Sequence, residues 1–194
     1  MMKRWSASRL AILVACLLVS VARGADASGI QNVNGHVSIG YAKLFIANAP
    51  GGSLSMAGGL DYPIARDLRA GFGVGLHLLG SRTVPRGSLV ANVDYGVFEA
   101  VLFAHWIPRH LGPVGRISAG PALISARAEL STSGGGAAFS DLAVEHLAPG
   151  VALDVTLISH STAPVRVGFE VGGRIGFLER EDWTMATTRV AFHY

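Results

Sequence analysis

The sequence predicts an all-β protein, an eight-stranded antiparallel up-and-down transmembrane β-barrel that follows a cleaved signal peptide. Three observations support this fold class. The chain opens with the pattern of an export signal, and its composition is too apolar and too poor in charge for an ordinary soluble domain. The rest of the chain divides into about eight segments of alternating polarity separated by turn residues, which is typical of membrane-spanning barrels.

Residues 1–27 have the three parts of a secretory signal peptide. Cations at the start precede an apolar run over 10–21, and small residues follow up to Ala27. The apolar run holds about twelve residues, whereas a membrane-spanning helix needs roughly 20. We expect cleavage after Ala27, with cleavage after Gly24 as the alternative, which leaves 28–194 as a single barrel domain.

The only cysteine, Cys16, lies within this signal, where residues 13–16 also fit the lipobox of a bacterial lipoprotein. The apolar run continues after Cys16, whereas a lipid anchor is normally followed by a polar tether, so lipidation is the less favoured alternative. The mature chain then has no cysteine and no disulfide or thiol chemistry.

The basic pI of about 9.4 belongs largely to the export signal. The chain holds sixteen Lys and Arg and thirteen Asp and Glu, and four of those cations and one of those anions lie in 1–27. The mature protein is therefore close to neutral. Since a nucleic-acid surface needs a basic balance, no nucleic-acid partner is expected.

The composition points to a membrane without a spanning helix. Charged residues make up 15% of the chain, 25 residues are glycine, and the mean hydropathy is +0.42. No stretch after residue 27 approaches the roughly 18 consecutive apolar residues of a helix candidate. The remaining way to cross a bilayer is a closed barrel, in which all backbone polar groups are paired between strands.

The first four strands are expected over 35–47, 53–64, 68–79 and a long segment that reaches Ile107. The third has the clearest alternation, with a period of two throughout. In the fourth, the apolar residues occupy odd positions before Val97 and even positions after it. We therefore expect a β-bulge, or the beginning of the strand, near Val97.

The last four strands are expected over 113–128, 141–158, 165–177 and 183–194. In each, apolar residues alternate with glycine, small or charged residues, and polar or glycine-rich turns separate the strands. No segment of the mature chain has a helical period, and nothing indicates a linker or a second domain.

Composition also predicts which face of the strands points outward. A soluble barrel needs an outer face rich in Lys and Glu, but the mature chain has one lysine, Lys43, and its polar face consists mainly of small residues with scattered ionisable ones. An eight-stranded barrel has an interior just wide enough for side chains to fill. The polar face is therefore expected inside and the apolar face against lipid.

The charges inside must be paired, because an isolated ion in a low-dielectric interior is costly. Folding the last hairpin should bring Glu170 near Arg189, and Asp154 should lie a diagonal step from Arg166 or Glu170. We interpret the set as a plug that keeps the barrel rigid, with a conductive or catalytic role as the alternative. The predicted interior charge network comprises Glu99, Arg116, Asp154, Arg166, Glu170, Arg174 and Arg189.

Aromatic residues provide a separate indication, because outer-membrane barrels carry aromatic girdles at both interfaces. With the N-terminus in the periplasm, aromatic side chains fall near both ends of the strands. The predicted interface aromatics are Phe45, Tyr62, Trp106, Phe177 and Trp183.

Signal peptide, eight alternating strands, the segment Gly-Leu-Asp-Tyr-Pro-Ile-Ala-Arg-Asp-Leu-Arg-Ala-Gly at 59–71 and the ending Arg-Val-Ala-Phe-His-Tyr at 189–194 together resemble the outer-membrane β-barrel superfamily of proteins A and X. The resemblance implies location in the outer membrane, contact with its lipid and lipopolysaccharide, and a monomer. It also implies that Val190, Phe192 and Tyr194 form the signal that the barrel assembly machinery reads, although Tyr replaces the commoner terminal Phe. No peptidoglycan-binding domain is expected after the barrel.

We expect a structural or surface-interaction role, with external loops around 47–53, 80–88, 129–140 and 179–182 meeting an unknown external ligand. The first alternative is a narrow pore for small solutes, suggested by the glycine-lined interior. The second is a lipid A-modifying enzyme, which resembles this chain in size and uses Ser, His and an acidic group.

Candidate catalytic residues are few. His160 and Ser161 are adjacent but fall in a predicted periplasmic turn, on the wrong side of the membrane. His77, with Ser81 and Asp94 nearby, is better placed but lacks that family's local motif. The histidines have no metal-ligand spacing, and the glycines at 71–75 follow strand alternation and do not form a phosphate loop, so no metal or cofactor is expected.

Overall fold

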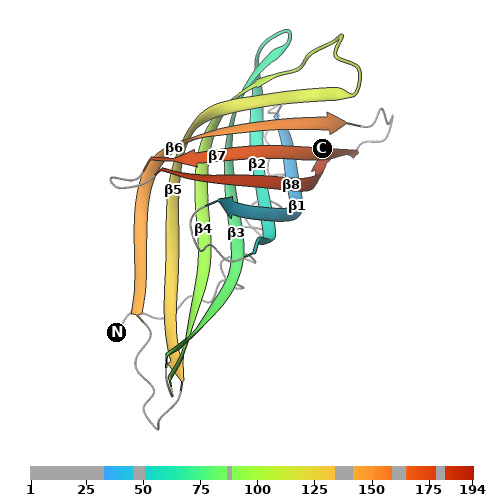
Figure 1. Ribbon diagram of the computed structural model, residues 1–194. Helices are drawn as coiled ribbons and strands as arrows, with labels where there is room; N and C mark the ends of the chain where they lie inside the picture. Colours follow the sequence, from blue (N-terminus) through green and yellow to red (C-terminus); the bar gives the residue numbers. More distant parts are fainter. Residues whose placement is uncertain (1–32, 46–50, 87–88, 134–141, 159–164, 178–181) are drawn as a thin grey trace, which may run out of the picture.

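A computed structural model describes residues 33–45, 51–86, 89–133, 142–158, 165–177 and 182–194 of the chain. Its strands close into one antiparallel barrel in which sequence neighbours pair and β1 pairs with β8, so the predicted fold class is confirmed (Figure 1). The strands are β1 (Asn34–Phe45), β2 (Ser53–Ala65), β3 (Leu68–Arg86), β4 (Leu89–Trp106), β5 (Val114–Ser133), β6 (Leu142–Ile158), β7 (Arg166–Gly176) and β8 (Trp183–His193).

The barrel closes where the two ends of the described chain meet. The amide of Gly35 donates to the carbonyl oxygen of Tyr194 at 2.9 Å, and the amide of Tyr194 donates back at 3.0 Å. We call this end of the barrel the terminal end and the opposite end the loop end. The tight turn between β2 and β3 also lies at the terminal end.

The predicted signal peptide, 1–27, lies outside the described residues, so its cleavage remains a prediction. In the part of the chain that the structure describes, no helix is long and apolar enough to cross a membrane.

Side chains alternate between the two faces of the wall as predicted. Large apolar residues such as Phe72 and Leu102 are exposed on the outer surface, whereas polar residues such as His77, Glu99 and Arg174 are buried inside. An outer surface of this kind is stable only against an apolar solvent, because it would otherwise expose large apolar area to water. The barrel therefore has the polarity of a membrane-spanning protein.

The wall is much taller on one side. Strands β3 to β6 have 17 to 20 residues, whereas β1, β7 and β8 have 11 or 12. Figure 1 shows these four strands continuing together beyond the others toward the bottom of the view. We call this part the raised sheet, formed by residues 80–86, 89–96, 127–133 and 142–148.

The raised sheet corrects two predicted loops. Residues 80–86 were expected in a loop but pair with β4 as far as Arg86 opposite Leu89, and 129–133 belong to β5. The residues expected to form the tips of those loops, at 87–88 and 134–141, lie outside the described part of the chain.

The ladder between β3 and β4 does have an irregularity near Val97, as predicted, but it lies on β3 and not on β4, and β4 begins earlier, at Leu89. Strand β4 keeps one register along β5, and the irregularity lies across from it, between Leu78 and Gly80 of β3. Gly80 has a φ of 86°, a left-handed conformation that favours glycine at such a bulge. The apolar residues of β4 change parity because the environment changes: past Val97 toward the loop end, the outer face becomes polar and the inner face apolar.

Neighbouring strands show the same exchange of polarity. In the raised sheet the outward residues Asp94, Arg127 and Glu145 are exposed, while Tyr95 and Ala126 face inward and pack on buried apolar residues. Nearer the terminal end the outward residues are apolar. We call this level the polarity switch, and it marks where the strands leave the apolar belt of the barrel.

Candidate functional site: the charged interior

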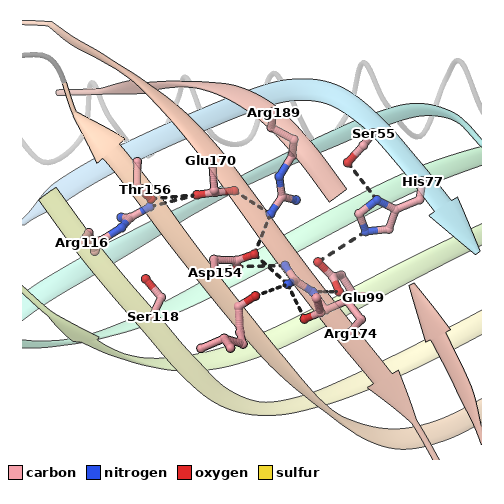
Figure 2. Close-up of polar contacts among 12 residues, drawn as sticks. Ser55, His77, Glu99, Arg116, Ser118, Asp154, Thr156, Glu170, Arg174 and Arg189 are labelled. Carbon is pink, nitrogen blue, oxygen red and sulfur yellow. Dashed lines mark hydrogen bonds and ion pairs between the residues drawn. The ribbon is translucent and has the colours of Figure 1, made fainter. Parts of the chain in front are cut away.

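Arg174 of β7 lies at the centre of the barrel interior and is 1% exposed. Its Nε donates to Oε2 of Glu99 at 2.6 Å, and its two terminal nitrogens donate to the two carboxylate oxygens of Asp154 at 2.7 and 3.0 Å. This two-point contact is the strong geometry for a guanidinium and a carboxylate. Figure 2 shows Arg174 joining β4, β6 and β7 through these contacts.

Arg189 of β8 continues the chain of ions toward the terminal end. Its terminal nitrogen lies 2.6 Å from Oε1 of Glu170 and 3.2 Å from Oδ1 of Asp154. Glu170 and Arg189 are direct cross-strand neighbours, which explains their contact. The hydroxyl of Thr156 also donates to Glu170, at 3.3 Å.

Arg116 of β5 links this centre to a third group. It lies 3.3 Å from Glu170 and 3.7 Å from Asp61, and Asp61 in turn forms an ion pair with Arg69. Four arginines and four carboxylates therefore alternate along one connected path, which we call the ion chain. Its members in order are Arg69, Asp61, Arg116, Glu170, Arg189, Asp154, Arg174 and Glu99.

Alternation of sign is what makes these ions tolerable. A single buried ion keeps a desolvation penalty of several kcal/mol, which an opposite charge with good hydrogen-bond geometry offsets. The eight charges cancel, and every member touches at least one ion of opposite sign. The interior therefore needs no counter-ion from outside.

A serine, a histidine and an acid end the path toward the loop end. The hydroxyl of Ser55 lies 2.9 Å from Nδ1 of His77, and Nε2 of His77 lies 3.4 Å from Glu99. Nucleophile, base and acid stand in the order of a hydrolase triad. All three side chains are at most 2% exposed, and Glu99 is also bound to Arg174, so the hydroxyl of Ser55 is enclosed within the barrel.

The interior around the ion chain is almost full. The cavity among these side chains has a volume of about 10 Å³, close to the minimum for one water molecule. Gly172 illustrates the tightness, since a Cβ at this position would stand 1.9 Å from Oδ1 of Asp154. Glycines on the inner face leave the room that the long charged side chains occupy.

The structure brings six of the seven predicted network residues together. They are Glu99, Arg116, Asp154, Glu170, Arg174 and Arg189, all buried. Arg166 does not join them: it has the inward parity of β7 but is exposed at the first residue of the strand, where the barrel end is open to solvent. Of the two predicted diagonal neighbours of Asp154, the register places Glu170 there and not Arg166, and the ion partners of Asp154 are Arg174 and Arg189.

Sequence reasoning missed the other members of the site. Asp61 stands between the outward residues Leu60 and Tyr62, so its inward parity was available in the alternation, and Arg69 has the same signal. The link from Ser55 to His77 could not be found this way, because it depends on the register between β2 and β3.

Four of the five predicted interface aromatics are exposed on the outer surface: Phe45, Tyr62, Trp106 and Phe177. Trp183 is a correction, since it is 3% exposed and lies inside the barrel. It shares the odd parity of Arg189 on β8, and Gly176 opposite it leaves the space that the indole fills.

The three residues of the predicted assembly signal, Val190, Phe192 and Tyr194, lie on the outer face of the last strand and are about 40% exposed each. Their recognition by the assembly machinery remains a prediction.

Toward the loop end the interior becomes apolar. Trp183 and Met185 of β8 meet inward residues of β1, β3, β4 and β5, and we call this cluster the apolar layer. Its buried members include Ala42, Leu44, Leu79, Val97, Ile124, Trp183 and Met185. Among the described residues, no group of three or more His, Cys, Asp or Glu is arranged to hold a metal ion.

A closed eight-stranded barrel with an apolar outer belt and a charged interior defines the class of small outer-membrane barrels. No protein-family profile matches the chain, and no curated protein matches its sequence. Solved structures do share the fold, and they are outer-membrane proteins. The resemblance to the superfamily of proteins A and X is thus confirmed at the level of the fold.

Neisserial surface protein A is 14% identical, with 83% of this chain and 95% of that chain covered and a TM-score of 0.59. A major outer membrane protein of Thermus thermophilus is 10% identical, with 84% and 100% covered and a TM-score of 0.55. The attachment invasion locus protein Ail of Yersinia pestis is 12% identical, with 84% and 100% covered and a TM-score of 0.51. At these identities the similarity shows the fold alone.

Proposed function

We propose that this protein is a closed, non-conducting barrel of the bacterial outer membrane that acts through its raised sheet at the cell surface. The observation that carries the proposal is the ion chain. Paired charges fill the interior and leave about 10 Å³ of space, which is too little for a path of water or solute.

Planar-bilayer recording tests the closed interior. Purified, refolded protein should give no stepwise conductance above the lipid background, while a general porin inserted in the same membrane should. Reproducible steps from the wild-type chain would contradict the plug and favour the alternative of a narrow pore for small solutes.

The raised sheet supports a surface-interaction role. Its outward side chains Asp94, Arg127 and Glu145 are exposed, and the sheet extends well past the apolar belt. Ail, which shares the fold, is named for attachment and invasion and has been crystallised with a heparin analogue. We infer a comparable class of role here, with outer-membrane lipid and lipopolysaccharide around the belt, a monomeric barrel and an unidentified external ligand.

Single cysteines can test the orientation, because the predicted mature chain has none of its own. Glu129→Cys, in the raised sheet, should react with a membrane-impermeant maleimide on intact cells. Arg109→Cys, in the turn between β4 and β5, should react only after the outer membrane is permeabilised. The reverse pattern would place the raised sheet in the periplasm and contradict the proposed role at the cell surface.

A lipid A-modifying activity is not favoured, because the hydroxyl of Ser55 is buried inside the barrel. Mass spectrometry of lipid A from cells with and without the protein should show identical acylation. A difference in acylation that depends on Ser55 would contradict this.

We also propose that Val190, Phe192 and Tyr194 direct insertion by the barrel assembly machinery. Deletion of Tyr194 should lower the fraction of protein that shows heat-modifiable migration in gels of the outer-membrane fraction. Unchanged insertion of the shortened chain would remove this role.

A further inference from the structure

A second cavity lies at the loop end, between the raised sheet and the ends of the short strands. Its volume is about 190 Å³. The raised sheet contributes Tyr95, Ala126 and Val144, while Leu44 of β1, Leu79 of β3 and Trp183 of β8 form the other walls. It therefore stands on the apolar layer, on the side away from the ion chain.

The lining of this cavity selects for hydrocarbon. Its side chains are aliphatic or aromatic apart from Arg127 and His146. The guanidinium of Arg127 is half exposed and forms an ion pair with Glu129, so it does not demand an anionic ligand in the cavity. An engineered apolar cavity of about 150 Å³ stays dry and binds benzene. The present cavity is partly open, since Val144 in its lining is 44% exposed, but its lining is of the same apolar kind and favours an apolar occupant.

The edge of β6 connects the cavity to the outer surface. Within the described residues, β7 pairs with β6 only as far as Gly150 opposite Gly176, and one further amide, of Phe177, reaches Pro149. Beyond that point β6 continues to Leu142 paired with β5 alone. Along this free edge Val144 and His146 line the cavity, whereas Leu147 points outward and is 66% exposed.

The edge lies at the polarity switch. Leu147 and Phe177 belong to the apolar outer surface, and the next outward residue of β6, Glu145, is charged and accepts a 2.6 Å hydrogen bond from Ser125. In the described part of the chain, the apolar outer belt and the cavity are thus separated by a stretch of β6 that pairs with β5 alone. An acyl chain that crosses this edge would pass from the outer belt into the cavity.

We propose that this cavity binds one acyl chain of a membrane lipid from the leaflet at the loop end. The proposal rests on the membrane placement proposed above. The bound chain passes over the edge of β6 above the end of β7, and its hydrocarbon lies between Val144 and Trp183. The polar part of the lipid remains outside, beside Glu145 and the exposed side of the raised sheet.

Tryptophan fluorescence offers a direct test, because 28–194 contain only Trp106 and Trp183. The probe is a vesicle of phosphatidylcholine with brominated acyl chains, which quench indole at contact distance. In the Trp106→Phe variant the signal comes from Trp183, which is buried within the barrel. We expect brominated vesicles to quench it by half or more relative to unbrominated vesicles.

Two matched variants isolate the cavity. Ala128→Phe, and independently Ala126→Leu, should fill it from the raised sheet and cut the quenching of Trp183 at least twofold, with lipid outside the wall unchanged. Equal quenching with and without these substitutions would overturn the proposal, as would the absence of quenching. Quenching only by brominated fatty acid added from solution would also overturn it, because the source would not be membrane lipid.

The Trp183→Phe variant separates this proposal from the membrane placement itself. It retains Trp106 on the outer face, 48% exposed, which brominated lipid must quench in an inserted barrel. Quenching of Trp106 without quenching of Trp183 refutes the acyl-chain site alone. Absence of quenching at Trp106 refutes the membrane placement on which both proposals depend.

Discussion

The two halves of the barrel interior differ in the side chains that occupy their inward-facing positions: charged pairs in the ion chain, and apolar residues in the apolar layer. Around the ion chain, the inward-facing residues include the eight paired charges beside small residues and a few apolar ones such as Val101 and Phe103, and the large outward residues on the same strands are apolar. In the raised sheet, the inward residues of β4 and β5 include the apolar Tyr95 and Ala126, whereas their outward residues include the charged Asp94, Arg127 and Glu129. The two faces of β4 and β5 therefore exchange their roles at the polarity switch.

The difference shows that the surroundings of the wall decide what lies within it. Where lipid covers the outside, alternation leaves the polar residues to the interior, and they must pair with one another. Where water covers the outside, alternation returns to the arrangement of a soluble sheet, with one apolar face. The most informative substitutions test one half against the other.

The largest effect is expected from Arg174→Leu. It leaves Glu99 and Asp154 without their closest cation, and breaking a buried pair costs about 3–5 kcal/mol. Urea unfolding from lipid vesicles measures the loss. Arg109→Leu is the matched control, since its ion pair with Asp67 is solvent-exposed and should contribute about 1 kcal/mol or less. Equal losses would mean that the buried contacts of Arg174 contribute no more to the free energy of unfolding than an exposed ion pair does.

Phe72→Arg and Asp94→Arg together test the outer face on the two sides of the polarity switch. Phe72 is exposed on the belt, where an arginine near the bilayer midplane costs about 2–4 kcal/mol. Asp94→Arg also points outward, but from the raised sheet and opposite Glu129, and should change stability by about 0.5 kcal/mol or less. Similar unfolding free energies for both variants would mean that Phe72 and Asp94 face the same solvent. That result would contradict a change from lipid to water at the polarity switch.

Neighbouring glycines of β7 sharpen the contrast between inside and outside. Gly172→Ala drives a methyl group into the carboxylate of Asp154, which Arg174 and Arg189 hold in place, and overpacking of this kind costs about 1–3 kcal/mol. At Gly173, a Cβ meets no atom within 4 Å, so Gly173→Ala should be neutral or slightly stabilising. Thermal unfolding of both variants measures the difference, and equal midpoints would show that Asp154 moves freely.

Apart from the control variants, Met185→Leu should have the smallest effect. Met185 is fully buried in the apolar layer, where a volume-conserving apolar exchange costs less than about 1.5 kcal/mol. Its midpoint in urea should stay close to that of the wild type. A loss as large as that of Arg174→Leu would show that the apolar layer is as strictly specified as the ion chain.

Alternation along the strands was enough to predict the fold, the eight strands and most of the buried charges. It also contained the answer for Trp183, whose odd position on β8 matches that of the buried Arg189. Trp183 was instead predicted at the membrane interface, because aromatic residues are common there. That prediction gave its residue type more weight than its odd position on the strand. At Val97 the change of parity was real, but its cause was a change of solvent and not a bulge in β4.

Contacts between distant strands could not be predicted in the same way. Arg174 meets Glu99 across the barrel, and Asp61 meets Arg116, through distances fixed by barrel closure and strand register. Arg166 has the correct parity, yet its place at the strand end leaves it in solvent. The odd or even position of a residue on its strand determines whether it faces inward or outward. Its position along the barrel axis determines whether that face meets other side chains, lipid or water.

The ion chain also constrains the order of assembly. Its members come from seven of the eight strands, and Arg174 and Glu99 are 75 residues apart in sequence. Three links lie within single hairpins, those between β2 and β3, β6 and β7, and β7 and β8, whereas the others join strands that no single hairpin contains. A half-formed barrel would therefore hold unneutralised ions beside lipid, a state of high free energy. The full set of ion pairs forms only when β2 to β8 have come together, so we expect insertion of this barrel to be cooperative.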